Sequence, residues 1–338
     1  MRASIADVAK LANVSISTVS RVINRRELVN AKTRERVESA IAELAYRPNA
    51  FARGLMLRRS EIVGLVLPDL HGEFYSEIIR GANLEARRSG YNLVVSSAYE
   101  DDDDTHSLLE TMRQRALLDG IAVMVSEVTD RVQSILARFS LPVVVLDADV
   151  DGIPHDCVII DQRAGAVALM EHVVRACGAQ RVIFVGGQET NVDTIARREA
   201  YQQVLTQAGL PFSAEDIYHL DYQYDTAFEL AAHCVQDWAG RGNCVFAAND
   251  EMAAGIIAAA KAAGVSLPEN LAVVGFDDTR VARMTYPALT TVRVPMATMG
   301  AKAIHLLCQR IGDPHLPPTR ISLAPELVVR ESCGFTLT

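Results

Sequence analysis

Polar side chains follow three of the short apolar runs in this sequence and could together hold a ligand. Asp147, Asn249 and Asp277 each come directly after such a run, which we interpret as a β-strand. Ligands of open parallel α/β sheets bind beyond the carboxyl ends of the strands, so these side chains are expected to converge on one cleft. Carboxylates and an amide suit a hydroxyl-rich ligand. Asp250 and Asp278, the next acids along the chain, are interpreted equally well as caps of the helices that follow.

No grouping of residues predicts catalysis, a metal site or a cofactor. Gly186 and Gly187 lack the surroundings of a phosphate-binding loop, and His155 near Cys157 lacks a spacing typical of metal ligands. The acidic run Glu100–Asp104 is interpreted as a solvated loop. The cysteines stand far apart without a CxxC pair, which favours reduced thiols over disulfides or zinc. They are Cys157, Cys177, Cys234, Cys244, Cys308 and Cys333.

The charge of the chain is unevenly distributed. Its 338 residues are 49% hydrophobic, enough for about two domains with a core each. The net charge is −9, of which the first 60 residues carry +7 and the remainder −16. Such a basic head indicates that the head alone contacts a polyanion. No run approaches the roughly 18 apolar residues of a membrane span and no secretory signal is visible, so we expect a cytoplasmic protein without membrane contacts.

The basic head shows helical spacing in three short segments. Ser4 is placed to cap the first, with Asp7 three residues later in a capping-box arrangement. Ser15 or Ser17 can cap the second, which has one apolar and one polar face. The third segment spans Ala31–Leu44. Two small helices joined by a short turn and braced by a third form the helix-turn-helix arrangement.

Three stretches of the head carry a resemblance to a known family: Ile5–Ala9, Val14–Asn24 and Tyr46–Asn49. They are similar to the head of the lactose repressor/galactose repressor family, and the resemblance extends over nearly the whole chain. It implies a sequence-specific transcriptional regulator that binds double-stranded DNA and places its second helix in the major groove.

The resemblance implies two kinds of DNA contact from the head. Ile16, Ser17 and Arg21 are expected to contact base edges, with Arg21 as the main reader because a guanidinium can bind guanine through two hydrogen bonds. Ile16 and Ser17 differ from the bulkier pair of the lactose repressor, so the operator of that protein is not expected here. Ordinary exposed positions are the alternative for Thr18 and Ser20. Contacts that orient the head on phosphates are expected from Ser4, Ser15, Thr18, Asn24 and Tyr46.

Residues 49–60 resemble the hinge helix of the same family. By this resemblance Asn49, Ala52 and Leu55 contact DNA when two hinges pair across the minor groove, with Leu55 as a wedge between base pairs. The segment is too short to be a stable helix alone, and Gly54 lowers its helix propensity further. An inert linker is the alternative.

The rest of the chain alternates apolar runs with helical segments, which predicts parallel sheets covered by helices. The runs are Ile62–Leu67, Leu93–Ser96, Ile121–Val125, Val143–Leu146, Val182–Val185, Val245–Ala248 and Ala272–Phe276. The helical segments include Phe74–Ser89, Gly165–Cys177, Arg198–Ala208, Thr226–Trp238 and Met252–Ala263.

The predicted fold class is therefore α/β, with an N-terminal helix-turn-helix head of three helices and a hinge helix. The resemblance implies that the body is periplasmic-binding-protein-like, with two subdomains of parallel sheets flanked by helices. The expected domains are a DNA-binding head (1–48), a hinge (49–60) and an effector-binding and dimerisation domain (61–338). Within the last, one subdomain comprises about 61–160 plus 293–321, and the other about 161–292 plus 322–338.

The resemblance also assigns an effector site to the body. The positions that match hydrogen-bonding residues of the family are Asp147, Arg197, Asn249 and Asp277. Ala200 replaces the glycine of the family motif around Arg197. Phe74 and Tyr222, and with them Met296, are expected to cover the apolar face of a sugar. A saccharide is the leading candidate, but relatives that bind purines share the acid at the strand end, so Asp277 does not separate the two.

We therefore expect a repressor of carbohydrate-catabolic genes that binds a near-palindromic operator as a homodimer. A small sugar-like effector is expected to control it, and induction is the expected sign. The alternatives are a regulator that responds to a purine or nucleoside, and a stand-alone sugar-binding protein, which the basic head disfavours. An enzyme with an appended DNA-binding head is disfavoured because the cleft residues include no recognisable nucleophile or metal site.

Overall fold

The computed structural model describes residues 3–24, 29–46, 60–97, 118–240 and 242–335. The predicted hinge residues Asn49, Ala52 and Leu55 and the acidic run Glu100–Asp104 lie outside these residues, as does the side chain of Asn24. The chain divides into two compact units, residues 1–60 and 61–338, which are described separately.

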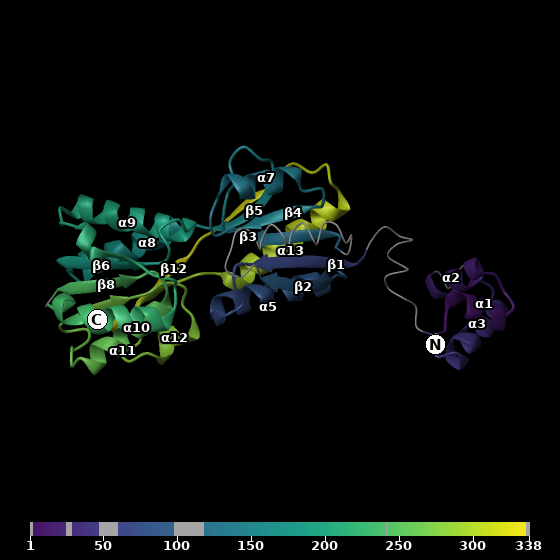
Figure 1. The fold of residues 1–338 in the computed structure, drawn as a ribbon, viewed down its shortest axis with the longest axis horizontal. Helices are drawn as coiled ribbons and strands as arrows, with labels where there is room; N and C mark the ends of the chain where they lie inside the picture. Colours follow the sequence, from purple (N-terminus) through teal and green to yellow (C-terminus); the bar gives the residue numbers. More distant parts are fainter. Residues whose placement is uncertain (1–2, 25–28, 47–59, 98–117, 241, 336–338) are drawn as a thin grey trace. The chain divides into compact units, whose positions relative to one another are not determined.

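The first unit contains three helices, α1 (Ile5–Leu11), α2 (Ile16–Asn24) and α3 (Ala31–Glu43) (Figure 1). Each begins after a capping side chain: Ser4, Ser15 and Asn30 each accept a hydrogen bond from the backbone N–H three residues later. Asp7 accepts a hydrogen bond from the Ser4 N–H at 2.9 Å, which completes the predicted capping box. The helix-turn-helix head is confirmed. Its buried core consists of Val8, Ala9, Ala12, Val19, Val22, Val37 and Ala40.

The first sheet of the second unit has six parallel strands in the order β11-β5-β4-β3-β1-β2. Helices α5 (Gly72–Arg88) and α13 (Met296–Gly312) cover one face, and α7 (Asp130–Arg138) covers the other (Figure 1). Successive residues of a strand point to opposite faces of the sheet. Leu65 packs in the core between the sheet and α5, and Val66 packs in the core between the sheet and α7. The strands are β1 (Ile62–Leu67), β2 (Asn92–Ser97), β3 (Gly120–Met124), β4 (Val143–Leu146), β5 (Asp156–Ile160) and β11 (Arg320–Leu323).

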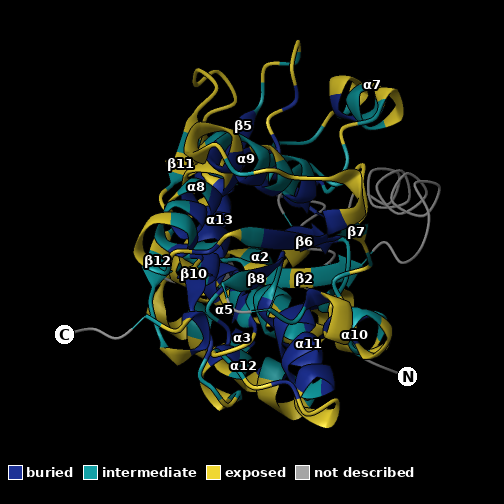
Figure 2. Ribbon diagram, turned by 90° about the vertical axis from the view of Figure 1, so that its left-hand side faces the viewer, coloured by how far each residue is buried: buried dark blue, intermediate teal, exposed yellow. Residues whose placement is uncertain are grey.

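The second sheet has four parallel strands in the order β7-β6-β8-β9. Its strands are β6 (Arg181–Gly186), β7 (Ile217–His219), β8 (Asn243–Ala247) and β9 (Ala272–Val274). Helices α8 (Gln162–Glu171) and α9 (Val192–Ala208) pack on one face, and α10 (Tyr224–Trp238) and α11 (Asp250–Ala262) on the other (Figure 1). Helix α8 continues as a π-helical turn, η2 (His172–Ala176). Figure 2 shows the buried residues gathered on β6 and α11.

Three segments of the chain connect the two sheets: the one after β5, the one before α13, and the one after β11. The second and third pair as a short antiparallel ribbon of β10 (Thr291–Arg293) and β12 (Glu326–Val328). The remaining short elements are η3 (Ala214–Asp216), α12 (Arg280–Met284) and η4 (Glu331–Cys333). The second unit is thus the predicted α/β body with two subdomains.

Several elements differ from the sequence-based expectation. Strand β5 was not predicted although Cys157–Ile160 is an apolar run of four residues. Strand β11 alternates polar and apolar residues, and β7, β10 and β12 are three residues long, so these four gave no clear apolar run. Helix α9 begins at Val192 rather than at Arg198, because the Asn191 side chain accepts hydrogen bonds from the N–H groups of Asp193 and Thr194.

Helices α5 and α13 approach each other closely at two glycines. A Cβ on Gly300 would overlap the carbonyl oxygen of Ile78, and one on Gly81 would overlap that of Ala297. Both obstacles are backbone atoms, so the helices would have to separate to admit a methyl group. The absence of a side chain at Gly300 is therefore required by this packing.

We expect Gly300→Ala to lower the free energy of unfolding by about 3 kcal/mol, the upper end of the usual cost of overpacking. Urea unfolding followed by circular dichroism measures the change. Gly312→Ala is the matched control, because this glycine ends the same helix and has no atom near its added Cβ among the described residues. Equal stabilities of the two variants would contradict the packing argument.

Candidate functional site

One cavity of the second unit is lined by all six residues predicted to bind an effector. Its volume is about 630 Å³, which lies within the usual range for small-molecule sites. Apolar residues of the first subdomain, such as Val123 and Val125, form part of the wall. The six predicted residues in the wall are Phe74, Asp147, Arg197, Tyr222, Asn249 and Asp277.

Arg197, on α9, is a buried cation at the wall of this cavity, with a side chain that is 2% exposed. Its Nη1 donates to the carbonyl oxygen of Ala248 at 2.6 Å. Its Nη2 donates to Gln162 Oε1 at 2.8 Å and to Asp193 Oδ2 at 3.3 Å. The guanidinium carbon lies 4.0 Å from the centroid of the Phe276 ring, a cation–π arrangement. These contacts fix the orientation of the guanidinium.

Three carboxyl groups surround Arg197. Asp193 Oδ2 and Asp277 Oδ1 lie 3.3 and 4.0 Å from its Nη2, and Asp147 Oδ1 accepts a hydrogen bond from Gln162 at 3.5 Å. Burial raises the pKa of all three carboxyl groups, and the Arg197 charge opposes that rise. Repulsion from Asp193 raises the pKa of Asp147 further. One cation therefore faces three carboxyl groups, and burial favours their protonated forms while the cation favours the charged ones.

Three polar atoms of this group have no hydrogen-bond partner among the described residues: Asp193 Oδ1, Asp277 Oδ1 and Arg197 Nε. Buried polar atoms are rarely left unpaired, because an unmade hydrogen bond costs about 1–3 kcal/mol. The residues that carry these atoms line the cavity, so two acceptors and one donor lie next to the space that a ligand with hydroxyl or N–H groups would fill.

The backbone holds three of the six predicted residues in an unusual conformation. The φ angles of Asp147, Tyr222 and Asp277 are 66°, 67° and 109°. Asp277 is fixed there by two backbone hydrogen bonds, from its N–H to Val292 at 2.8 Å and from the Val294 N–H at 3.3 Å. Positive φ is rare for residues other than glycine, and such strain concentrates at ligand sites.

Tyr222 is held against the cavity wall by its neighbours. Its hydroxyl lies 2.6 Å from Thr194 Oγ1 and donates to Asn191 at 3.0 Å. Gly187 makes room for the ring, since a Cβ there would overlap it. Asn249 donates from Nδ2 to the carbonyl oxygen of Tyr222 at 2.9 Å and caps α11 with Oδ1. One amide hydrogen of Asn249 is thereby used for positioning, and the other can still be donated to a ligand.

The interpretation of Asp250 and Asp278 as helix caps is wrong. Asp250 Oδ2 accepts from the N–H of Thr279 at 2.7 Å, and its Oδ1 from Thr291 Oγ1 at 2.6 Å. Asp278 pairs with Arg293 at 2.8 Å. Both acids therefore connect the ends of the second sheet to the β10 segment. The cap of α11 is Asn249, and α12 has no side-chain cap.

Several residues of the site were not predicted. Asp193, Gln162 and Tyr75 all lie close to Arg197 or line the cavity. Asp193 stands four residues before Arg197, a spacing typical of ion pairs within a helix. The pair was not recognised because the helix was expected to begin only at Arg198. Met296, expected to cover the ligand, is buried at the start of α13 and is not part of the cavity wall.

The stability of the second unit should fall as the pH rises through the titration of Asp250. Burial raises the pKa of this carboxyl from 3.8 to about 7, against the hydrogen bonds from Thr291 and Thr279. The native state therefore binds more protons than the unfolded state between these values, and the free energy of unfolding declines across that window. Asp250→Asn should remove this decline, so the slope of the free energy of unfolding against pH should differ between the two proteins by up to about 1.4 kcal/mol per pH unit. Urea unfolding of both proteins from about pH 5 to 8 measures the difference, and parallel curves would contradict it.

The polar face of α2 carries the residues predicted to contact DNA. Ser15 Oγ lies 2.7 Å from Ser17 Oγ and 2.8 Å from Thr18 Oγ1, so three hydroxyls gather at the N-terminus of this helix. Ile16 is 52% exposed, and Arg21 is exposed further along the helix. The arrangement places an apolar group, hydroxyls and a guanidinium on one accessible helix.

Ser4 and Tyr46 also have structural roles in the head. Ser4 caps α1, and its hydroxyl donates to Asp7 at 2.7 Å. Tyr46 is half-buried and packs against the core of the three helices. Their predicted phosphate contacts therefore remain predictions beside these structural roles.

Comparison with known proteins places the chain in a family. Residues 4–49 match the family model described as bacterial regulatory proteins, lacI family, and residues 171–333 match that of a periplasmic binding protein-like domain. The chain is 33% identical to catabolite control protein A of Priestia megaterium over 98% of this chain and 99% of that protein. The chain belongs to the LacI family of bacterial regulators. This LacI-family protein is also 32% identical to the ribose operon repressor of Escherichia coli K12, over 98% of this chain and 99% of the relative.

Solved structures of the LacI family have the same fold. The Lac repressor dimer bound to operator and the anti-inducer ONPF matches with a TM-score of 0.86 and 26% identity, over 98% of this chain and 99% of that one. The complex of the transcriptional regulator CelR with cellobiose matches with a TM-score of 0.73 and 28% identity, over 98% and 100%.

The LacI-family protein is thus a DNA-binding transcriptional regulator, because the family consists of regulators and not of enzymes. This excludes the two alternatives of a stand-alone sugar-binding protein and an enzyme with an appended head. None of the described helices is long and apolar enough to cross a lipid bilayer.

Proposed function

We propose that this LacI-family regulator binds a small sugar-like effector in its 630 Å³ cavity and thereby changes the affinity of its head for an operator. The observation that carries the proposal is the cluster around Arg197, where Asp193 Oδ1 and Asp277 Oδ1 lack a partner among the described residues. A ligand that donates hydrogen bonds to both oxygens would remove the cost of leaving them unpaired.

A saccharide suits both kinds of wall in this cavity. Neighbouring hydroxyls can donate to Asp193 and Asp277 and accept from Arg197 Nε, while the C–H face of the ring packs on Phe74. The cellobiose in the CelR structure and the ribose operon controlled by the E. coli relative support this class of ligand.

A purine or nucleoside is the second candidate. Its ring N–H groups can serve the same acceptors, and Phe74 and Tyr75 supply aromatic faces on which a base can stack. Saccharides and purines differ in how many hydrogen-bond donors they offer to the carboxyl groups. Measuring which of the two classes binds to the purified protein distinguishes the two candidates.

We propose further that the regulator represses carbohydrate-catabolic genes from a near-palindromic operator, bound as a homodimer. Two-fold symmetry requires two related half-sites, and the Lac repressor match is a dimer on its operator. This proposal includes the base contacts of Ile16, Ser17 and Arg21. It also includes the hinge at 49–60 with its wedge Leu55, and the predicted domain limits.

The position of the cavity supports a coupling between the cavity and the head. Its wall takes Phe74 and Asp147 from one subdomain and Arg197, Tyr222 and Asp277 from the other, so a bound ligand favours one arrangement of the two subdomains. We propose that this arrangement separates the paired hinges and weakens operator binding. Couplings of this kind are typically about 1–3 kcal/mol, or about 5–150-fold in affinity.

The experiment for the ligand is a thermal-stability panel of sugars, sugar phosphates, sugar acids and purines. A ligand at about 100 times its dissociation constant adds about 2.7 kcal/mol of stability. A rise in melting temperature with a sugar or sugar derivative supports the proposal. A rise with purines or nucleosides alone would overturn the saccharide and favour the second candidate.

The experiment for the operator is selection of bound sequences from random double-stranded DNA. We expect an enriched inverted repeat whose two halves are protected equally in footprinting. A single unrepeated half-site would contradict the symmetric dimer.

A further inference from the structure

Two clusters of potential metal ligands occur among the described residues, both in the second unit and away from the cavity wall. One contains Asp149, His155 and Cys157, and the other His172, Cys177 and Cys333. In the first, both ring nitrogens of His155 are already used: Nδ1 lies 2.7 Å from the carbonyl oxygen of Ile153, and Nε2 accepts from the Val150 N–H at 3.4 Å. That imidazole has no lone pair left for an ion.

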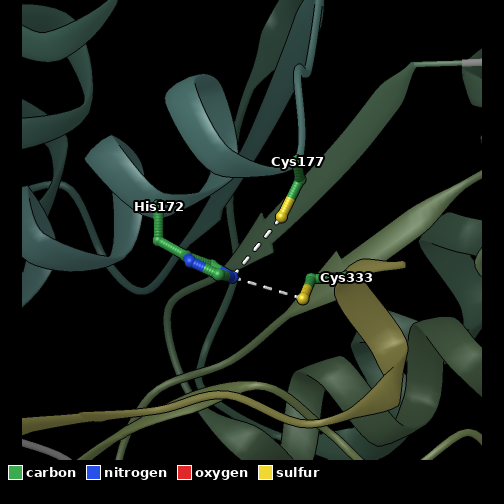
Figure 3. Close-up of side chains that lie close together, drawn as sticks. All are labelled: His172, Cys177 and Cys333. Atoms are coloured by element: carbon green, nitrogen blue, oxygen red, sulfur yellow. Dashed lines mark hydrogen bonds between the residues drawn. The ribbon is translucent and has the colours of Figure 1, made fainter. Parts of the chain in front are cut away.

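In the second cluster one ring nitrogen faces two sulfur atoms at equal distance. His172 Nε2 lies 3.4 Å from Cys177 Sγ and 3.4 Å from Cys333 Sγ, as Figure 3 shows. All three atoms lie within 4.8 Å of one another. A zinc ion bonded to nitrogen at about 2.05 Å and to sulfur at about 2.3 Å with tetrahedral angles sets nitrogen and sulfur about 3.5 Å apart. The two observed nitrogen–sulfur distances therefore match those between zinc ligands.

The π-helical turn η2 brings two of the three groups together. His172 and Cys177 are five residues apart, which would separate them by about 140° around an α-helix. The Cys177 N–H instead donates to the carbonyl oxygen of His172 at 3.1 Å, a bond that spans five residues and sets the two on the same side. π-Helical turns are rare in proteins overall, and those that occur are often found at functional sites.

The third group comes from the C-terminal segment, where Cys333 ends η4 and is 4% exposed. Its sulfur accepts a hydrogen bond from Thr290 Oγ1 at 3.2 Å. A hydrogen bond of this kind orients a metal-binding sulfur.

We propose that His172, Cys177 and Cys333 form a site for a thiophilic divalent cation, with Zn²⁺ as the ion whose ligand preferences they match. Two thiolates and one imidazole are a known ligand set for zinc and leave the fourth position to water. His172 and Cys177 are half-buried, so solvent and an ion can reach the site. The ion would tie η2 to η4, and through Thr290 to the start of β10, one of the segments that connect the two sheets.

The test uses the full chain, reduced and stripped of metal by a chelator, with Co²⁺ as the spectroscopic probe and Zn²⁺ as its competitor. We expect one Co²⁺ per chain with thiolate-to-cobalt charge-transfer absorption, displaced by one equivalent of Zn²⁺. Cys177→Ser and Cys333→Ser should each weaken binding by at least about 100-fold and lose the corresponding absorption. Cys234→Ser is the matched control, because this half-buried cysteine lies on α10 outside the cluster, and it should bind as the parent does.

Co²⁺ affinity and charge-transfer absorption equal to those of the parent in both cluster variants would overturn the proposal, as would the absence of this absorption from the reduced parent chain. A Cys177–Cys333 disulfide in the parent, together with no metal binding after reduction, would likewise overturn it and assign the pair to redox chemistry. Circular dichroism spectra that match the parent confirm that each variant is folded. None of these measurements depends on which effector occupies the cavity.

Discussion

Arg197→Ala is expected to abolish the response of operator binding to the effector while the free protein still binds operator. The guanidinium joins Gln162 and Asp193 and lies over Phe276, so its loss removes both a ligand donor and the group that orders the wall. Operator affinity measured by fluorescence anisotropy, with and without the sugar that stabilises the parent, provides the readout. The parent should change by about 5–150-fold and the variant by less than about 2-fold.

The same variant should also be destabilised, because it leaves buried carboxyl groups without their cation. Breaking a buried ion pair from one side costs about 3–5 kcal/mol. The deficit should shrink at low pH, where protonation of Asp147, Asp193 and Asp277, whose pKa values burial already raises, removes the unpaired charges.

Two further variants separate these effects from general damage. Arg198→Ala removes the neighbouring cation on α9, which pairs with the exposed Glu189 at 3.2 Å, and should behave like the parent. Arg197→Lys keeps the positive charge but lacks the planar guanidinium with its several N–H donors. Compared with Arg197→Ala, it should restore the free energy of unfolding more fully than the effector response of operator binding. An Arg197→Ala protein that folds and responds as the parent does would remove Arg197 from the effector site.

Arg21→Ala is expected to lower affinity for the selected operator by about 10- to 100-fold. Arg21 is exposed on α2, the helix that we propose enters the major groove, and one two-pronged contact to guanine contributes about 1–3 kcal/mol of discrimination. Binding to random DNA should weaken far less, because that binding depends on phosphate contacts. Anisotropy titrations against both DNAs at several salt concentrations separate the two quantities.

Lys32→Ala is the matched control for this prediction. Lys32 is also an exposed cation of the head, but it lies on α3. Its removal should lower affinity for operator and random DNA by similar, small factors that vanish at high salt. Equal losses on both DNAs for Arg21→Ala would contradict its assignment as a base reader.

The sequence predicted the architecture well where patterns were local. Local patterns gave the cap Ser4, the buried strand Ile62–Leu67 and the polar strand ends at Asp147 and Asp277, each from a few neighbouring residues. Short-range hydrogen bonds and the alternation of burial determine such features, so they can be inferred without tertiary contacts.

What the sequence did not predict depends on residues far apart in the chain. Asp250 accepts hydrogen bonds from Thr279 and Thr291, which a cap interpretation could not foresee. Cys177 and Cys333 meet because a π-helical turn and the C-terminal segment converge. Long-range pairings of this kind have no periodic signal, and the spacing rules for metal ligands apply only to local motifs.

The most direct test of the central claim is the operator affinity of the parent chain as the stabilising sugar is titrated. The proposed coupling between the cavity and the head predicts that the operator dissociation constant rises by about 5–150-fold and saturates at the concentration that saturates the cavity. A dissociation constant that stays unchanged while the sugar fully occupies the protein would contradict the claim that this cavity controls DNA binding.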